Sequence, residues 1–181
     1  FPDGGVARLR LFGEVKLNWD IYKNKNDLIE LSSLKLGGSI VAYNNAHYGD
    51  VSALLSHGRG KTMGDGWETR RRREPGNDWI IIKLATKGLI KKIEIDTAHF
   101  KGNYPDQASV QVSNFDKNKG LEELINDSHN WKYILNKSKL QADNIHNYEV
   151  NDTSIKDVTH VRLNIYPDGG VSRLRIFGLK L

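Results

Sequence analysis

DVTHVRLNIYPDGGVSRLRIFG, residues 157–178, alternates apolar and polar side chains on both sides of a turn. Such alternation is typical of strands that bury one face, so residues 157–165 predict a β-strand. Pro167–Gly170 predicts the turn, because proline fixes φ, aspartate can bond the following backbone and glycine accepts positive φ. Residues 172–176 return with apolar side chains on the core side, which predicts an antiparallel hairpin that closes a sheet. The polar face of the first strand carries His160, Arg162 and Asn164.

Further segments predict strands that are separated by short polar connections. The clearest are Trp79–Leu84, Ile90–Thr97 and Ala108–Phe115, and the shorter ones are Trp131–Leu135 and Asn147–Val150. Short helical turns are indicated at residues 51–55 and 121–125, without a long amphipathic helix. Closely spaced strands of this kind are typical of a sandwich. We therefore expect an all-β protein with an antiparallel β-sandwich.

The sequence contains an internal repeat of domain size. Phe1–Gly13 (FPDGGVARLRLFG) and Tyr166–Gly178 (YPDGGVSRLRIFG) are identical at ten of 13 positions and lie 165 residues apart. That spacing corresponds to a whole domain rather than to a solenoid repeat. We expect residues 1–15 to be the terminal strand of a truncated first copy, residues 16–26 a linker, and residues 27–181 a complete second copy. The alternative is one domain that uses the same hairpin twice.

Two polar segments beside the predicted strands carry residues suited to a ligand site. Gly64–Trp79 (GDGWETRRRREPGNDW) holds four consecutive arginines, four carboxylates and two tryptophans. Charged groups between tryptophans need hydrogen-bond partners or a ligand, so this segment is typical of a loop that lines a small-molecule pocket. Glu94–Pro105 (EIDTAHFKGNYP) ends a strand and enters a loop that contains His99 and Asn103. Whether the two segments meet depends on strand pairing, which the sequence leaves open.

Both segments resemble the corresponding loops of allantoicases, the enzymes that split allantoate into ureidoglycolate and urea. The motifs that carry the resemblance are GDGWETRRRREPGNDW at residues 64–79 and IDTAHFKGNYP at residues 95–105. The resemblance implies a jelly-roll sandwich of the galactose-binding-like type in a hydrolase of purine (allantoin) degradation. Allantoicases contain a pair of similar domains, and the resemblance covers the second of them almost entirely.

Allantoate carries a carboxylate and paired ureido groups on one carbon, and a site for it must match these groups. An arginine that binds through two N–H groups suits the carboxylate. An acid is needed to protonate the departing urea, and a base is needed to activate water. The acid or base candidates are Glu68, Asp96, His99 and Asp65, and the substrate-binding candidates are Arg70, Arg72, Trp67, Asn103 and His47. Structural interpretations also exist: ion pairs for the arginines, a backbone-bonded ring for His99 and a turn for Asp65. Asp3 and Asp168 are interpreted as turn formers.

The composition excludes several classes of protein. The 181 residues contain no cysteine, which removes disulfides, thiol catalysis and cysteine-based zinc sites. No apolar run approaches the ~18 residues of a membrane span. The net charge of +5 suits anion binding, yet the basic block Arg70–Arg73 is short and the predicted strands lack exposed aromatic platforms. We therefore expect neither a nucleic acid nor a membrane as a partner.

The remaining expectations concern cofactors, assembly and location. His47, His57, Asp96 and His99 lack the tight spacing of metal motifs, so no metal ligand is assigned. Asp and His side chains from distant loops could still hold Mn or Zn. We expect a cytoplasmic location, because Leu179–Leu181 resembles a peroxisomal ending only weakly. We also expect a homo-oligomer. The competing hypothesis for function is a non-catalytic β-sandwich module that binds a small polar or anionic ligand.

Overall fold

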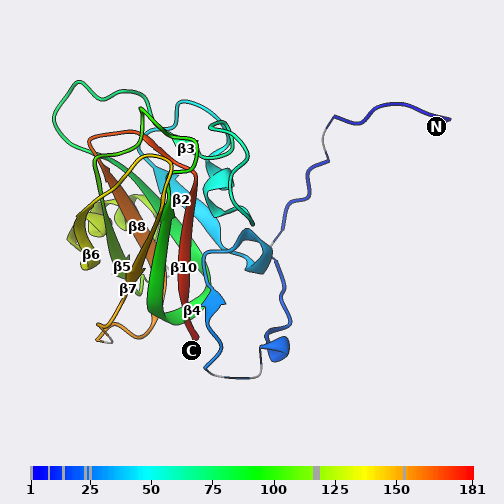
Figure 1. Ribbon diagram of the computed structural model, residues 1–181. Coiled ribbons are helices and arrows are strands. Elements are labelled where there is room, and N and C mark those ends of the chain that lie inside the picture. Colours follow the sequence, from blue (N-terminus) through cyan, green and yellow to red (C-terminus); the bar gives the residue numbers. More distant parts are fainter. Residues whose placement is uncertain are drawn as a thin grey trace.

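The computed structural model describes residues 2–7, 9–13, 15–22, 24, 26–115, 119–152 and 154–181. Strands dominate, and short helical segments lie between them (Figure 1). In chain order the elements are η1 (Trp19–Ile21), β1 (Ile29–Glu30), η2 (Leu34–Leu36), β2 (Ser39–Tyr43), η3 (Val51–Leu55), β3 (Trp67–Glu68), β4 (Asp78–Asp96), β5 (Gln107–Ser113), α1 (Leu121–Asp127), η4 (Ser128–Asn130), β6 (Lys132–Lys139), β7 (Ile145–Glu149), β8 (Val158–Tyr166), β9 (Gly170–Val171) and β10 (Arg173–Lys180). Within the described part of the chain, no helix has the length and apolar character needed to cross a membrane.

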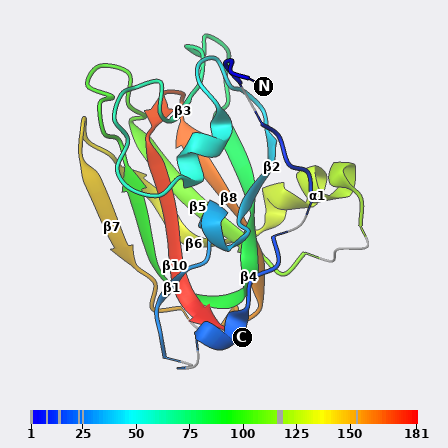
Figure 2. The same cartoon turned by 90° about the vertical axis from the view of Figure 1, so that its right-hand side faces the viewer.

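Strand β4 takes part in both layers of a sandwich (Figure 2). Its first part, residues 78–83, pairs with β2 and β8, and β5 and β6 continue that layer. Its last part, residues 88–96, pairs with β10 and β7, and β1 continues the other layer. Because these pairings are all antiparallel, the predicted antiparallel β-sandwich is confirmed. The segments Trp79–Leu84 and Ile90–Thr97, predicted as separate strands, belong to the two halves of one strand, β4, which ends at Asp96.

The path of β4 brings both of its ends to the same end of the sandwich. At its start, Asp78 N donates a hydrogen bond to Pro167 O at 3.1 Å. At its end, Asp96 O accepts a hydrogen bond from Ser172 N at 2.7 Å. The loop that enters β4 and the loop that leaves it therefore both reach the connection between β8 and β10.

The predicted hairpin of β8 with β10 is wrong, because the two strands lie in different layers. Strand β8 pairs with the first part of β4 and with β5, whereas β10 pairs with the last part of β4 and with β1. The connection between them contains β9, which pairs with β3. Alternation does not distinguish a hairpin from a corner between sheets, because in both cases the apolar faces point into one core. The buried side chains of this core include Val161, Leu163, Ile165, Leu174 and Ile176.

The polar face of β8, predicted to lie opposite the core, is buried as well. Helix α1 lies outside this sheet, and its Leu124 packs in a second apolar cluster with Phe115 and Trp131 (Figure 2). Arg162 is only 3% exposed and lies 4.5 Å from the centre of the Trp79 ring. A strand that is buried on both faces thus carries the alternating pattern of a half-buried strand.

Burial of His160 on this face predicts a loss of stability in mild acid. Desolvation, helped by the charge of Lys83, lowers the pKa of His160 to about 4. The unfolded chain therefore binds more protons than the folded protein as the pH falls from about 6.5 towards 4, and the free energy of unfolding falls with it. We expect a decrease of about 2 kcal/mol between pH 7 and pH 5, measured by urea denaturation. His160→Phe should make the free energy of unfolding depend less on pH, and the same substitution at exposed His57 should not. An equal pH dependence in both variants would contradict the assignment of this effect to His160.

The two copies of the repeated segment have different environments. In the second copy, Leu174 and Ile176 are fully buried in the core. The equivalent residues of the first copy, Leu9 and Leu11, are 81% and 89% exposed, and the described residues between 2 and 13 form no helix or strand. Figure 1 shows this segment, in blue, running away from the sandwich. The division of the chain into the end of one copy, a linker and a second copy stays a prediction.

Candidate functional site

A cavity of about 740 Å³ lies where the loops meet at one end of the sandwich. Its walls come from residues 47–48, 68–72, 102–104, 106 and 167–169. The predicted site residues that line it are Glu68, Arg70, Arg72, Asn103 and His47. The two polar segments of the sequence therefore contribute to one site, because β4 brings them to the same end of the sandwich.

Glu68 is held at the cavity by backbone and side-chain hydrogen bonds. Its carbonyl oxygen accepts a hydrogen bond from His47 N at 2.8 Å, and its strand β3 pairs with β9. Asn103 Nδ2 donates a hydrogen bond to the Glu68 carboxylate at 2.5 Å. The neighbouring Trp67 is fully buried and donates from Nε1 to Asn45 O at 2.8 Å. Trp67 therefore supports the site from the core and does not line the cavity.

The arginines of the loop differ in how far their charges are neutralised. Arg72 forms an ion pair with Asp78, which is fully buried, and a second one with Glu74 at 3.4 Å. Arg70 also pairs with Glu74, and its hydrogen bond lowers the pKa of that carboxyl. Arg71 lines the cavity and forms no side-chain hydrogen bond or ion pair with the described residues. Arg71, which was not among the predicted site residues, is thus the least neutralised of the three arginines.

Asp168, interpreted from the sequence as a turn former, also lines the cavity. Its carboxylate accepts a hydrogen bond from Arg72 N at 2.9 Å. The next residue, Gly169, has a φ of 137°, and a Cβ atom there would lie 2.7 Å from Pro105 N. Glycine is therefore required where the turn passes the loop after β4. The available signal was the repeated segment, which contains this turn in both copies. Other lining residues that sequence reasoning missed are Tyr48, Tyr104 and Asp106.

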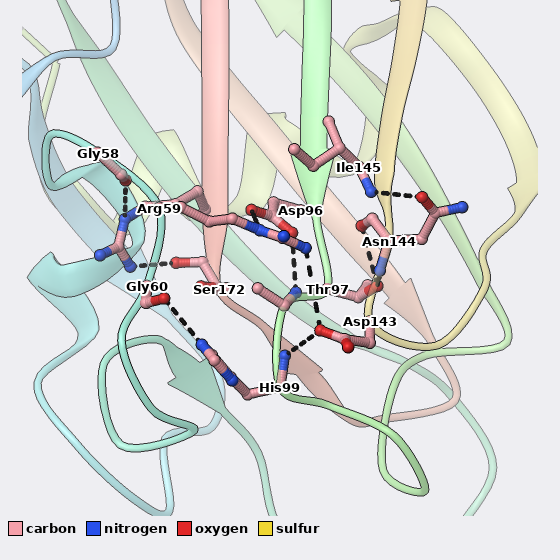
Figure 3. A network of polar contacts seen from close by, with 12 residues as sticks. Gly58, Arg59, Gly60, Asp96, Thr97, His99, Asp143, Asn144, Ile145 and Ser172 are labelled. Atoms are coloured by element: carbon pink, nitrogen blue, oxygen red, sulfur yellow. Dashed lines mark hydrogen bonds and ion pairs between the residues drawn. The ribbon is translucent and has the colours of Figure 1, made fainter.

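The other acid or base candidates lie outside the cavity, in contacts that join loops. They are Asp65, Asp96 and His99. Asp96 is 2% exposed and accepts a hydrogen bond from Arg59 Nε at 3.1 Å (Figure 3). Asp65 accepts a hydrogen bond from Arg173 Nη2 at 3.0 Å. The structure therefore places only Glu68, of the four candidates, in the cavity.

The cavity combines cations, carboxylates and an imidazole. Glu68, Asp106 and Asp168 supply the carboxylates, and His47 supplies the imidazole. Such a set can bind a small polar anion and transfer protons to or from it. Across the described residues, no group of three or more His, Cys, Asp or Glu side chains is arranged to hold a metal ion. The alternative of a Mn or Zn site stays a prediction.

Comparisons with known proteins agree on one family. A family model described as "Allantoicase repeat" matches residues 29–181, which include every residue that lines the cavity. A Burkholderia mallei protein named probable allantoicase 1 is 51% identical over 178 residues, or 98% of this chain and 52% of that protein. A solved allantoicase from Saccharomyces cerevisiae has a TM-score of 0.72 at 39% identity, over 83% of this chain and 43% of that chain. The chain spans about half the length of the curated relatives it matches.

The fold is shared with more distant domains. The F5/8 type C domain of a Bacteroides fragilis protein has a TM-score of 0.56 at 15% identity, over 80% of this chain and 93% of that domain. At that identity the likeness concerns the fold alone. The predicted galactose-binding-like type of sandwich is confirmed.

Proposed function

Because the chain belongs to the allantoicase repeat family, we propose that it releases urea from allantoate and leaves ureidoglycolate, in purine degradation. Support comes from the cavity in which Glu68, hydrogen-bonded to Asn103, lies together with the un-neutralised Arg71. The chain spans half the length of its relatives, so the proposal concerns the site that these residues contribute to the whole protein. A homo-oligomeric state and a cytoplasmic location stay predictions.

Arg71 is the proposed partner of the allantoate carboxylate. A guanidinium binds a carboxylate through parallel N–H donors, which fixes the orientation of the substrate as well as its charge. Arg70 and Arg72 are already in ion pairs with neighbouring carboxylates, so their charges are less available to the substrate. The ureido N–H groups of allantoate are donors, and the carboxylates of Asp106 and Asp168 are matching acceptors in the same cavity.

Glu68 is the proposed acid that releases urea. In its protonated form it donates a proton to a ureido nitrogen while the bond from that nitrogen to the central carbon breaks. The remaining ureido nitrogen stabilises the acyliminium-like cation that is left. Water then adds to this carbon, and its proton passes to a second group in the cavity, Asp168 or His47. That group returns a proton to Glu68 through solvent, which restores both residues for the next turnover. The products are urea and ureidoglycolate, with one water consumed, so no further co-reactant is required.

Urea release from allantoate tests this proposal, with Arg71→Met as the informative variant. Arg71→Met removes the carboxylate partner, so KM for allantoate is expected to rise roughly 10- to 100-fold. The matched control is Arg73→Met, because Arg73 is exposed and does not line the cavity. Equal KM values for the two variants would remove Arg71 from the substrate site.

The assay should include both this chain and the longer Burkholderia mallei relative. Turnover by this chain would support a complete site within residues 47–169. Turnover by the relative alone, lost in its equivalent of Glu68→Gln, would support a site that requires the rest of the protein. Binding of allantoate without urea release by either protein would overturn the proposal and favour the non-catalytic binding module.

A further inference from the structure

Two residues with positive φ contact each other beside the cavity loops. His99 and Asp143, with φ angles of 70° and 49°, are the only non-glycine residues with positive φ in the described part of the chain. His99 N donates a hydrogen bond to Asp143 Oδ1 at 2.8 Å, and Asp143 N donates one to Phe100 O at 3.2 Å. Positive φ is unfavourable for residues with a Cβ atom, so it persists only where surrounding contacts hold it. The contacts of His99 therefore hold its backbone in this unfavourable conformation.

The ring of His99 binds the loop that precedes β3. Its Nε2 lies 2.8 Å from Gly60 O. Figure 3 shows the ring pointing toward that carbonyl group. A carbonyl oxygen only accepts hydrogen bonds, so Nε2 carries a proton and donates it to this contact. Arg59, the neighbour of Gly60, reaches back to the buried Asp96 at 3.1 Å and to Asp143 at 3.9 Å. These contacts join the loop at residues 57–66 to the end of β4, to the loop that follows β4, and to the connection between β6 and β7.

Each of the two joined loops leads directly to one member of the Glu68–Asn103 pair. Residues 57–66 run into β3 and Glu68, and the loop after β4 runs from His99 to Asn103. Asn103 is further held by its carbonyl oxygen, which accepts a hydrogen bond from Gly170 N at 2.8 Å. A change in the spacing of the two loops would therefore alter the hydrogen bond between Glu68 and Asn103.

We propose that His99 is a positioning residue, which sets the geometry of Glu68 and Asn103 by tying their loops together, and that it is not an acid or base. The proposal rests on the proposed function for its effect on turnover. The tie between the loops can be measured independently of turnover. Since His99 does not line the cavity and its Nε2 is engaged by Gly60, its ring is not placed to exchange a proton with substrate.

The test compares His99→Gln with His99→Asn. The glutamine amide nitrogen lies the same number of bonds from Cβ as Nε2 of histidine, so it can still donate to Gly60 O. The asparagine amide is shorter and cannot reach, yet asparagine tolerates positive φ well, so the backbone is not penalised. Neither variant can act as a proton-transfer group at neutral pH. The pair therefore separates a lost loop contact from a lost acid or base.

We expect His99→Gln to keep kcat within about threefold of the parent and His99→Asn to lower kcat roughly 10- to 100-fold, because small displacements of reacting groups cost that much. Hydrogen–deuterium exchange at residues 57–66 and 97–106 should quicken at least about tenfold in His99→Asn alone, with little change in Tm. A collapse of kcat in both variants with exchange like that of the parent would overturn the proposal. Unchanged exchange in His99→Asn would also overturn it, even if no form of the protein released urea.

Discussion

Glu68→Gln is expected to lower kcat for urea release by roughly two to four orders of magnitude, which is the usual contribution of a positioned general acid or base. Glutamine is nearly isosteric with glutamate and can still accept a hydrogen bond from Asn103 Nδ2, so the geometry of the cavity is retained. Glutamine cannot donate a proton to the departing ureido nitrogen. KM for allantoate should change much less than kcat, because the proposed carboxylate partner, Arg71, is unaffected.

Glu74→Gln is the matched control for this variant. It makes the same chemical change in the same loop, but Glu74 does not line the cavity and its carboxylate pairs with Arg70. We expect kcat to remain within about threefold of the parent, since an exposed ion pair contributes little. Substantial turnover by Glu68→Gln, with loss of turnover in Glu74→Gln, would show that the acid is elsewhere in the loop.

Arg173→Met is expected to lower the free energy of unfolding by about 3 kcal/mol. The side chain of Arg173 is 2% exposed, and its guanidinium donates to Gly58 O, Ser172 O and both the carbonyl and the carboxylate of Asp65, at distances of 2.7 to 3.0 Å. Methionine fills a similar space but donates nothing, so these acceptors lose their partner. These hydrogen bonds hold the loop before β3 against β10. The amide protons of this loop should therefore exchange faster in the variant.

Urea denaturation of Arg173→Met and Arg73→Met provides the comparison. Arg73 is exposed, and a substitution there is expected to change stability by no more than about 0.5 kcal/mol. A similar midpoint for the two variants would mean that the hydrogen bonds of Arg173 contribute no more than surface contacts do.

Local patterns predicted most of the strands, because a side-chain period of two reports one buried face wherever a strand lies on a core. The segments around Ala108–Phe115 and residues 157–165 are strands β5 and β8 at nearly the predicted positions. The prediction of a hairpin between β8 and β10 was wrong for the same reason. The alternation of β8 and β10 is satisfied equally by one sheet or by two facing sheets, and the layers became clear only from strand pairing.

The site, like the fold, was predicted in part by the sequence and decided in part by contacts between distant residues. Polar loops with arginines, carboxylates and aromatic residues predicted a pocket, and Glu68 and Asn103 do meet in it. Residue type alone did not distinguish Arg71 from Arg70, because the difference lies in which carboxylates are within reach. Asp168 was missed as a lining residue because its role in a turn explained its presence in the sequence.

By itself, the sequence determined the β-sandwich class, the family and the two loops that build the cavity. Only the tertiary structure decided that both ends of β4 lie together, that Asp65, Asp96 and His99 join loops, and that Glu68 remains in the cavity. The physical reason is that a strand's alternation is set by its own residues. The meeting of side chains distant in the sequence depends on how strands pair and where their connections run, which no local pattern encodes.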